Sequence, residues 1–222
     1  MHDVSVFIDL RENSHSYLGE KHQYISSPYQ MTISKASTIE SVSTGGGDDH
    51  IIGNASNNVI LAGGGDDKIY AGEGRDLIEP GSGFNVIDVR EDTSENDFIL
   101  FDSNAGEQFN QIFNFEVSGI CDVLVFDYGL SNSRLSEVLS YKKNIDFSSF
   151  DIYCFDDFNV QSFMSNHHNI DDNKIILSYN DNSSSFNTEL YLFENSTSAD
   201  GELLHLASIS TDMESLSAWS SS

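Results

Sequence analysis

The most regular pattern of apolar and polar positions in the chain repeats every nine residues from Thr44 onward. Cut at that interval, the sequence reads TGGGDDHII, GNASNNVIL, AGGGDDKIY, AGEGRDLIE and PGSGFNVID. The eighth position is isoleucine in every repeat, namely Ile51, Ile60, Ile69, Ile78 and Ile87. The triplet x-Ile-x suits a strand of three residues. The pattern therefore predicts one turn and one short strand in each repeat.

Two successive repeats are expected to complete one coil, so that stacked coils form two parallel sheets with strands roughly 4.8 Å apart. The isoleucines then point inward and form an apolar spine between the sheets. A flexible Gly/Asp linker is the alternative interpretation, but linkers do not keep an apolar residue in phase over five repeats. The repeats therefore predict a parallel β-roll.

The polar positions of the repeats carry candidate chemistry. Glycine occupies the second and fourth positions in four of the five repeats, and Asn54 and Ser56 replace it in the second repeat. Glycine allows positive φ, which can turn successive carbonyl groups toward a common centre. The sixth position is always Asp or Asn, and a mixture of carboxylate and carbonyl oxygens suits calcium. The predicted ligands are Gly45, Gly47, Asp49, Asn58, Gly63, Gly65, Asp67, Gly72, Gly74, Asp76, Gly81, Gly83 and Asn85.

Turns on one side of the roll recur every second repeat, which predicts the pairs of ligands. Asp49, Asp67 and Asn85 fall on one side, and Asn58 and Asp76 fall on the other. Asparagine keeps an oxygen ligand but removes a negative charge. We therefore expect several calcium ions, with the principal site at Asp49 and Asp67 and with weaker or vacant sites where Asn58 or Asn85 takes part.

These residues resemble the RTX repeat GGxGxDxUx of bacterial exported proteins, in which U is a large apolar residue. The flanking segments 8–19 (IDLRENSHSYLG), 109–127 and 189–209 are similar to strands in the C-terminal domain of serralysin-type metallopeptidases. The resemblance implies a non-catalytic, extracellular domain in which a β-roll continues into a β-sandwich. It also implies folding upon calcium binding outside the cell, export by a type I secretion system and a protease or other cargo as partner.

On this basis the fold class is all-β, a parallel β-roll flanked and capped by a β-sandwich. Residues 1–43 are expected to form strands that pack on the roll, residues 44–101 the roll, and residues 102–222 the sandwich with a possible secretion-signal tail. Apolar runs between Asn, Ser, Asp and Gly clusters predict strands at 98–101, 122–126, 175–177, 190–193 and 203–206. Apolar spacing also predicts short helices around Leu135 and around Phe163.

The charge of the chain narrows the choice of partners. Asp and Glu number 36 against 10 Lys and Arg, which gives a formal net charge of -26. Such a chain repels nucleic acids and anionic membranes and attracts divalent cations. No stretch reaches membrane-spanning length, and the N-terminus lacks the features of a Sec signal peptide. We therefore expect no nucleic-acid partner and no membrane insertion.

Catalytic motifs are missing from the sequence. None of its seven histidines is followed by Glu, as the zinc motif HExxH requires, and no GxSxG elbow occurs. Two alternatives remain open, an accessory module of a carbohydrate-active enzyme such as a mannuronan epimerase and a fragment of a zinc metallopeptidase. Cys121 and Cys154 are either free buried thiols or a disulfide.

Overall fold

The computed structural model describes residues 4–24, 26–90, 95–102, 105–115, 122–127, 152–156, 174–180, 187–194 and 202–210. These residues form strands and turns, and none of them is helical. The chain divides into two compact units, one of Met1–Phe126 with Ser210–Ser222 and one of Asp127–Ile209. In the part of the chain that the structure describes, no helix has the length and apolarity needed to cross a membrane.

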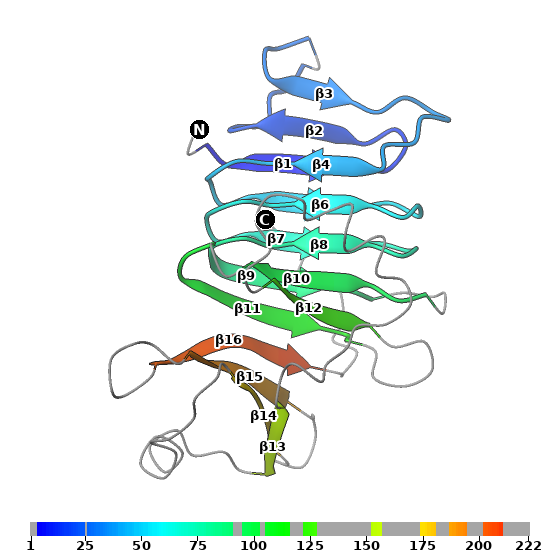
Figure 1. Cartoon of the computed structure of the whole chain (residues 1–222). Helices are drawn as coiled ribbons and strands as arrows, with labels where there is room; N and C mark the ends of the chain where they lie inside the picture. Colours follow the sequence, from blue (N-terminus) through cyan, green and yellow to red (C-terminus); the bar gives the residue numbers. More distant parts are fainter. Residues whose placement is uncertain are drawn as a thin grey trace. The chain divides into compact units, whose positions relative to one another are not determined.

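Each of the five repeats contributes one strand that contains its isoleucine. These strands are β5 (His50–Ile52), β6 (Val59–Leu61), β7 (Lys68–Tyr70), β8 (Leu77–Glu79) and β9 (Gly83–Asp88). β7 pairs in parallel with both β5 and β9 in one sheet, while β6 pairs in parallel with β8 in the other. Successive coils are stacked in Figure 1. The predicted parallel β-roll is confirmed.

The parallel pairing continues beyond the repeats in both directions. Before them, β1 (Val6–Asp9) pairs with β5 and β4 (Ser41–Ser43) pairs with β6. After them, β10 (Phe98–Asp102) pairs with β8 and β11 (Gln108–Phe113) pairs with β9. β12 (Val123–Asp127) lies next to β10. The predicted bounds of the three parts of the chain stay a prediction.

Two antiparallel strands extend the first sheet beyond β1. β2 (His15–Leu18) pairs with β1, and β3 (Gln30–Thr32) pairs with β2. Phe7 of β1 stacks on Tyr17 of β2, with ring centroids 5.0 Å apart. This end of the sheet is therefore fastened by aromatic contacts as well as by strand pairing.

The core of the roll is the column of isoleucines that the nine-residue period predicts. Ile51, Ile60, Ile69, Ile78 and Ile87 each have a relative exposure of 0%. The register aligns Ile51 with Ile69 and Ile69 with Ile87 in one sheet, and Ile60 with Ile78 in the other. Burial of one such side chain stabilises the fold by about 1.5–3 kcal/mol. The apolar spine therefore accounts for much of the cohesion between coils.

The second unit contains a sheet with the strand order β13-β14-β15-β16. Its strands are β13 (Ile152–Asp156), β14 (Lys174–Asn180), β15 (Asn187–Glu194) and β16 (Glu202–Ser210). β13 and β14 are parallel, and β14 and β15 are antiparallel. The five strands predicted after the repeats are confirmed. The predicted helices, Cys121 and the tail after Ser210 lie outside the described residues, and the β-sandwich stays a prediction.

Candidate calcium-binding turns

Turns on the same side of the roll stack directly on one another. Gly64 forms parallel bridges with Gly46 in the preceding coil and with Ser82 in the following coil. The backbone nitrogen of Gly64 donates to the carbonyl of Gly45 at 2.9 Å, and that of Ser82 donates to the carbonyl of Gly63 at 2.9 Å. The stacking of turns from every second repeat is thus maintained by backbone hydrogen bonds.

Glycine is required in these turns for both conformation and space. Gly65 has a φ of 119°, and a Cβ atom there would lie 2.5 Å from the carbonyl oxygen of Gly47. The predicted positive φ is found at Gly63, Gly65, Gly72, Gly74, Gly81 and Gly83. It is not found at Gly45 or Gly47, so that expectation is wrong for the first turn. At Gly47 the constraint is space, because a Cβ atom would lie 2.7 Å from the backbone nitrogen of Ser5.

The sixth-position side chains form a buried ladder on one side of the roll. Oδ1 of Asp67 accepts a 2.8 Å hydrogen bond from the backbone nitrogen of Asp49. Oδ1 of Asn85 likewise accepts from the nitrogen of Asp67 at 3.1 Å, and Oδ1 of Asp49 accepts from that of Val6 at 2.8 Å. The structure therefore brings Asp49, Asp67 and Asn85 together, and each side chain binds the coil that precedes it.

A second ladder lies on the other side of the roll. The backbone nitrogen of Asn58 donates to Oδ1 of Asp76 at 2.6 Å, so these two residues are also brought together. The ladder then continues through residues outside the repeats. The nitrogen of Asp76 donates to Asp97 at 2.8 Å, and the nitrogen of Asp97 donates to Asp122 at 2.9 Å.

Asp97 and Asp122 were not predicted, because they lie 21 and 25 residues beyond their partners and so break the period of the repeats. A shorter signal marks them. In the repeats, the sixth-position Asp or Asn precedes the buried isoleucine by two residues, as in Asp67-Lys-Ile69. Asp97-Phe-Ile99 and Asp122-Val-Leu124 follow the same order. The order Asp/Asn-x-apolar therefore identifies ladder positions even where the coil length changes.

The carboxylates of Asp49 and Asp67 carry uncompensated negative charge inside the turns. Their exposures are 2% and 0%, and the Oδ2 atom of each has no hydrogen-bond partner among the described residues. The pKa of Asp67 is raised to about 7, chiefly by burial and in addition by the neighbouring charges of Asp49, Asp48 and Asp66. The hydrogen bond from the Asp49 backbone only partly opposes this rise. A buried carboxylate without a counter-charge is costly, so this turn calls for a cation.

The donor atoms around Asp49 and Asp67 fit calcium. Calcium takes several oxygen ligands at once and accepts both carboxylates and backbone carbonyls. Among the residues with described positions, no group of three or more His, Cys, Asp or Glu side chains gathers to hold a metal. The glycine carbonyls that the sequence predicts as further ligands, beside Oδ2 of Asp49 and Oδ2 of Asp67, stay a prediction.

Exposed carboxylates surround the same turns. Oδ1 of Asp48 accepts a 2.9 Å hydrogen bond from the nitrogen of Asp66, and Oδ1 of Asp66 accepts one of 2.8 Å from Phe84. This outer ladder follows the fifth position of the repeats, where both side chains are exposed. It adds negative potential around the buried pair and favours the approach of a cation.

Comparison with known families agrees with this geometry. A family model described as the RTX calcium-binding nonapeptide repeat matches residues 43–78 in four copies. The fifth repeat, residues 80–88, lies outside the match, yet its Ile87 is in register with Ile69. No curated protein matches the chain significantly. The stacked glycine turns with their buried carboxylates are thus RTX repeats, and the chain contains a non-catalytic calcium-binding module.

Proposed function

We propose that the chain is an extracellular module whose roll folds when it binds calcium, and that this folding supports the export and stability of a cargo. The observation that carries the proposal is the pair of buried Oδ2 atoms at Asp49 and Asp67 that have no hydrogen-bond partner among the described residues. These two carboxylates are the principal ligands. The carbonyls of the turn glycines complete the principal site, and Asp76, Asn58 and Asn85 belong to positions that are weaker or vacant.

Calcium acts as a folding switch because it favours one state of the chain. Without the ion, the carboxylates of Asp49 and Asp67 oppose burial, and ordering each turn residue costs about 1–2 kcal/mol of backbone entropy. An ion that binds only the folded form adds about 2.7 kcal/mol per site at a concentration of 100 times its Kd. Several occupied sites together therefore decide whether the roll is folded.

Such a switch suits a protein that crosses membranes unfolded. A calcium-poor cytoplasm keeps the roll open for passage through a type I secretion channel, and calcium outside the cell folds it. Extracellular calcium sites have Kd values of roughly 10⁻⁴ to 10⁻³ M, which matches the free ion outside cells. RTX repeats are typical of secreted proteins. The similarity to the C-terminal domain of serralysin-type metallopeptidases supports the same role, with a protease as one possible cargo.

The test is a far-ultraviolet circular dichroism titration of the chelator-treated chain with calcium and, separately, with magnesium. We expect a cooperative gain of β-sheet signal with calcium alone. Asp67→Asn is the informative variant, because Oδ1 still accepts from the Asp49 nitrogen while the charge at Oδ2 is lost. Asp66→Asn is its matched control, since it removes an exposed charge one residue away.

Asp67→Asn is expected to raise the calcium midpoint at least tenfold, and Asp66→Asn to change it by less than threefold. A chelator-treated chain that already shows its full β-sheet signal, unchanged by calcium, contradicts the proposed switch. Equal responses of the two variants contradict the assignment of the principal site to the buried pair.

We also propose that the chain as a whole is non-catalytic. No HExxH or GxSxG motif occurs in its sequence. A casein hydrolysis assay with added zinc is expected to show no activity above buffer. Hydrolysis that disappears when zinc is chelated, and returns when zinc is restored, rejects this part of the proposal.

A further inference from the structure

The turn of the second repeat is built differently from the turns with glycine at the second and fourth positions. Asn54 and Ser56 occupy the two positions that are glycine in the other repeats, and Asn58 stands where the first and third repeats have Asp49 and Asp67. Unlike Asp49 and Asp67, Asn54 and Asn58 hydrogen-bond through carboxamide groups, which both donate and accept.

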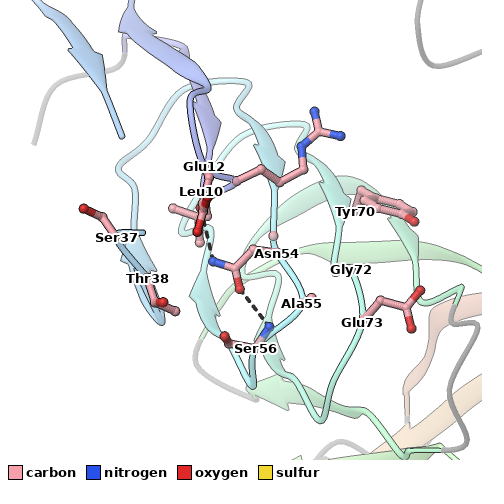
Figure 2. Close-up of a pocket in the computed structure, with 12 residues that line it drawn as sticks. Leu10, Glu12, Ser37, Thr38, Asn54, Ala55, Ser56, Tyr70, Gly72 and Glu73 are labelled. Carbon is pink, nitrogen blue, oxygen red and sulfur yellow. Dashed lines mark hydrogen bonds between the residues drawn. The ribbon is translucent and has the colours of Figure 1, made fainter. Parts of the chain in front are cut away.

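The carboxamide of Asn54 fastens this turn to two other segments of the chain. Its Nδ2 donates to the carbonyl of Ile39 at 2.7 Å and to the carbonyl of Leu10 at 3.2 Å. Its Oδ1 accepts a 2.9 Å hydrogen bond from the backbone nitrogen of Ser56. Figure 2 shows Asn54 between Leu10 and Ser56, joined to both by hydrogen bonds. Leu10 directly follows β1 and Ile39 precedes β4, so one side chain ties three segments together.

Asn58 completes the same network from inside the turn. It is 1% exposed, and its Oδ1 accepts from the backbone nitrogen of Asn54 at 2.9 Å. Its Nδ2 lies 3.3 Å from the carbonyl of Ile39 and 3.3 Å from Oδ1 of Asn54. Both polar atoms of this buried side chain therefore have partners, whereas Oδ2 of Asp49 and Oδ2 of Asp67 have none among the described residues.

The aspartate turns and the second-repeat turn are stabilised by different groups. A buried carboxylate oxygen without a hydrogen-bond donor is stabilised by a positive charge. An amide nitrogen instead donates hydrogen bonds to the carbonyl oxygens that a cation would need as ligands. An NH₂ group inside the turn also repels a cation. Asn85 shows the same behaviour, because its Nδ2 donates to the carbonyl of Gly81, a glycine of its own turn, at 3.4 Å.

We infer that Asn54 and Asn58 close the second-repeat turn in place of a cation, and that they determine that this turn does not take calcium. The inference rests on the proposed function, in which calcium binds at the aspartate turns. It goes further because it assigns the exclusion of calcium from this turn to the carboxamides of Asn54 and Asn58. The hydrogen bonds of these side chains to Leu10 and Ile39 then do not depend on the ion.

The test restores the aspartate pattern by combining Asn54→Gly, Ser56→Gly and Asn58→Asp in one variant. Calcium stoichiometry is measured by isothermal titration calorimetry and equilibrium dialysis on the full chain. We expect one more bound calcium ion per chain than in the wild type. Asn57→Asp is the matched control, because it adds the same charge at an exposed position of the same turn and should add no ion.

A measurement on the unaltered chain keeps the inference testable if the triple variant does not fold. In ¹⁵N-labelled protein saturated with calcium, the side-chain NH₂ protons of Asn54 and Asn58 should exchange with solvent at least tenfold more slowly than those of Asn57. Rapid exchange of these protons, or an unchanged calcium stoichiometry in a folded triple variant, overturns the inference. A wild-type chain that binds no calcium instead overturns the proposed function, so the two failures are distinguishable.

Discussion

The backbone nitrogen of Asp49 donates a hydrogen bond of 2.8 Å to Oδ1 of Asp67, a residue 18 positions later in the chain. One oxygen of the Asp67 carboxylate thus holds the preceding coil, while Oδ2 has no hydrogen-bond partner among the described residues. The same side chain therefore sets the register of the roll and offers charge to a cation. Because of this double role, an isosteric change at Asp67 should separate stability from calcium binding more clearly than truncation.

The raised pKa of Asp67 predicts a pH-dependent stability in the absence of calcium. Its pKa is about 7 in the folded chain against 3.8 for an ordinary Asp side chain, so the folded state holds this proton more tightly than the unfolded state. The contribution of this carboxyl group to the free energy of unfolding is therefore largest below about pH 4, and it falls as the pH rises toward about 7. Far-ultraviolet circular dichroism of the chain in calcium-free buffer should therefore show more β-sheet signal at pH 5 than at pH 8.

Asp67→Asn is the control for this dependence, because it keeps the acceptor for Asp49 and cannot titrate. Its β-sheet signal in calcium-free buffer should change less between pH 5 and pH 8 than that of the wild type. Calcium should also bind the wild type more tightly at pH 8, where no proton competes for Oδ2 of Asp67. An equal pH dependence in the two proteins contradicts the role of this carboxyl group.

Gly65→Ala should destabilise the calcium-loaded roll more than Gly106→Ala, a substitution of a glycine outside the stacked turns. The added Cβ atom meets the carbonyl oxygen of Gly47 at 2.5 Å, and the positive φ is unfavourable for alanine. Positive φ alone costs about 1–2 kcal/mol. Gly106→Ala isolates that cost, since Gly106 has a φ of 84° and no atom within 4 Å of an added Cβ. Urea denaturation should give the greater loss for Gly65→Ala.

Ile69→Ala should weaken the roll through the loss of core packing. Ile69 is completely buried in the central strand β7, and truncation of a buried isoleucine to alanine costs about 2–5 kcal/mol. Ile69→Val should cost only about 0.5–1.5 kcal/mol, while Lys68→Ala, at an exposed position of the same strand, should have little effect. Similar midpoints for Ile69→Ala and Lys68→Ala in thermal denaturation are incompatible with an apolar spine.

Asp97 provides a test of the ladder beyond the repeats. Its Oδ1 accepts from the backbone nitrogen of Asp76, so Asp97→Ala leaves that buried nitrogen without this acceptor, at a cost of about 1–3 kcal/mol. Asp97→Asn keeps an acceptor oxygen and should retain most of the stability. Denaturation of both variants at saturating calcium compares them, and equal losses indicate that the charge matters more than the hydrogen bond.

The sequence predicts the repeating features of this fold because they depend on local periodicity. The nine-residue spacing of Ile51, Ile60 and Ile69 is sufficient for the strands, the buried spine and the pairing of Asp49 with Asp67. Features that depend on irregular coil lengths were not predicted. Asp122 accepts from Asp97, 25 residues earlier, so the nine-residue period does not predict that contact, although the order Asp-x-apolar marks the position.

The hydrogen bonds of the Asn54 carboxamide could not be predicted from the sequence, for a different physical reason. Its acceptors are the carbonyls of Leu10 and Ile39, which lie 44 and 15 residues earlier in the chain. Backbone carbonyls are the same for every residue type, so the sequence carries no mark of their use. The only available signal was the absence of glycine at Asn54 and Ser56, which showed that the turn differs without showing how.

Within the repeats, the stacking gives the roll the mechanics of a one-dimensional polymer. β7 contacts β5 on one side and β9 on the other, and β6 lies between β4 and β8. When each layer touches only its neighbours, the free energy is a sum of terms for layers and for the interfaces between them. Damage to an outer layer then shortens the ordered stack, whereas damage at β7 divides it into two segments that no longer reinforce one another.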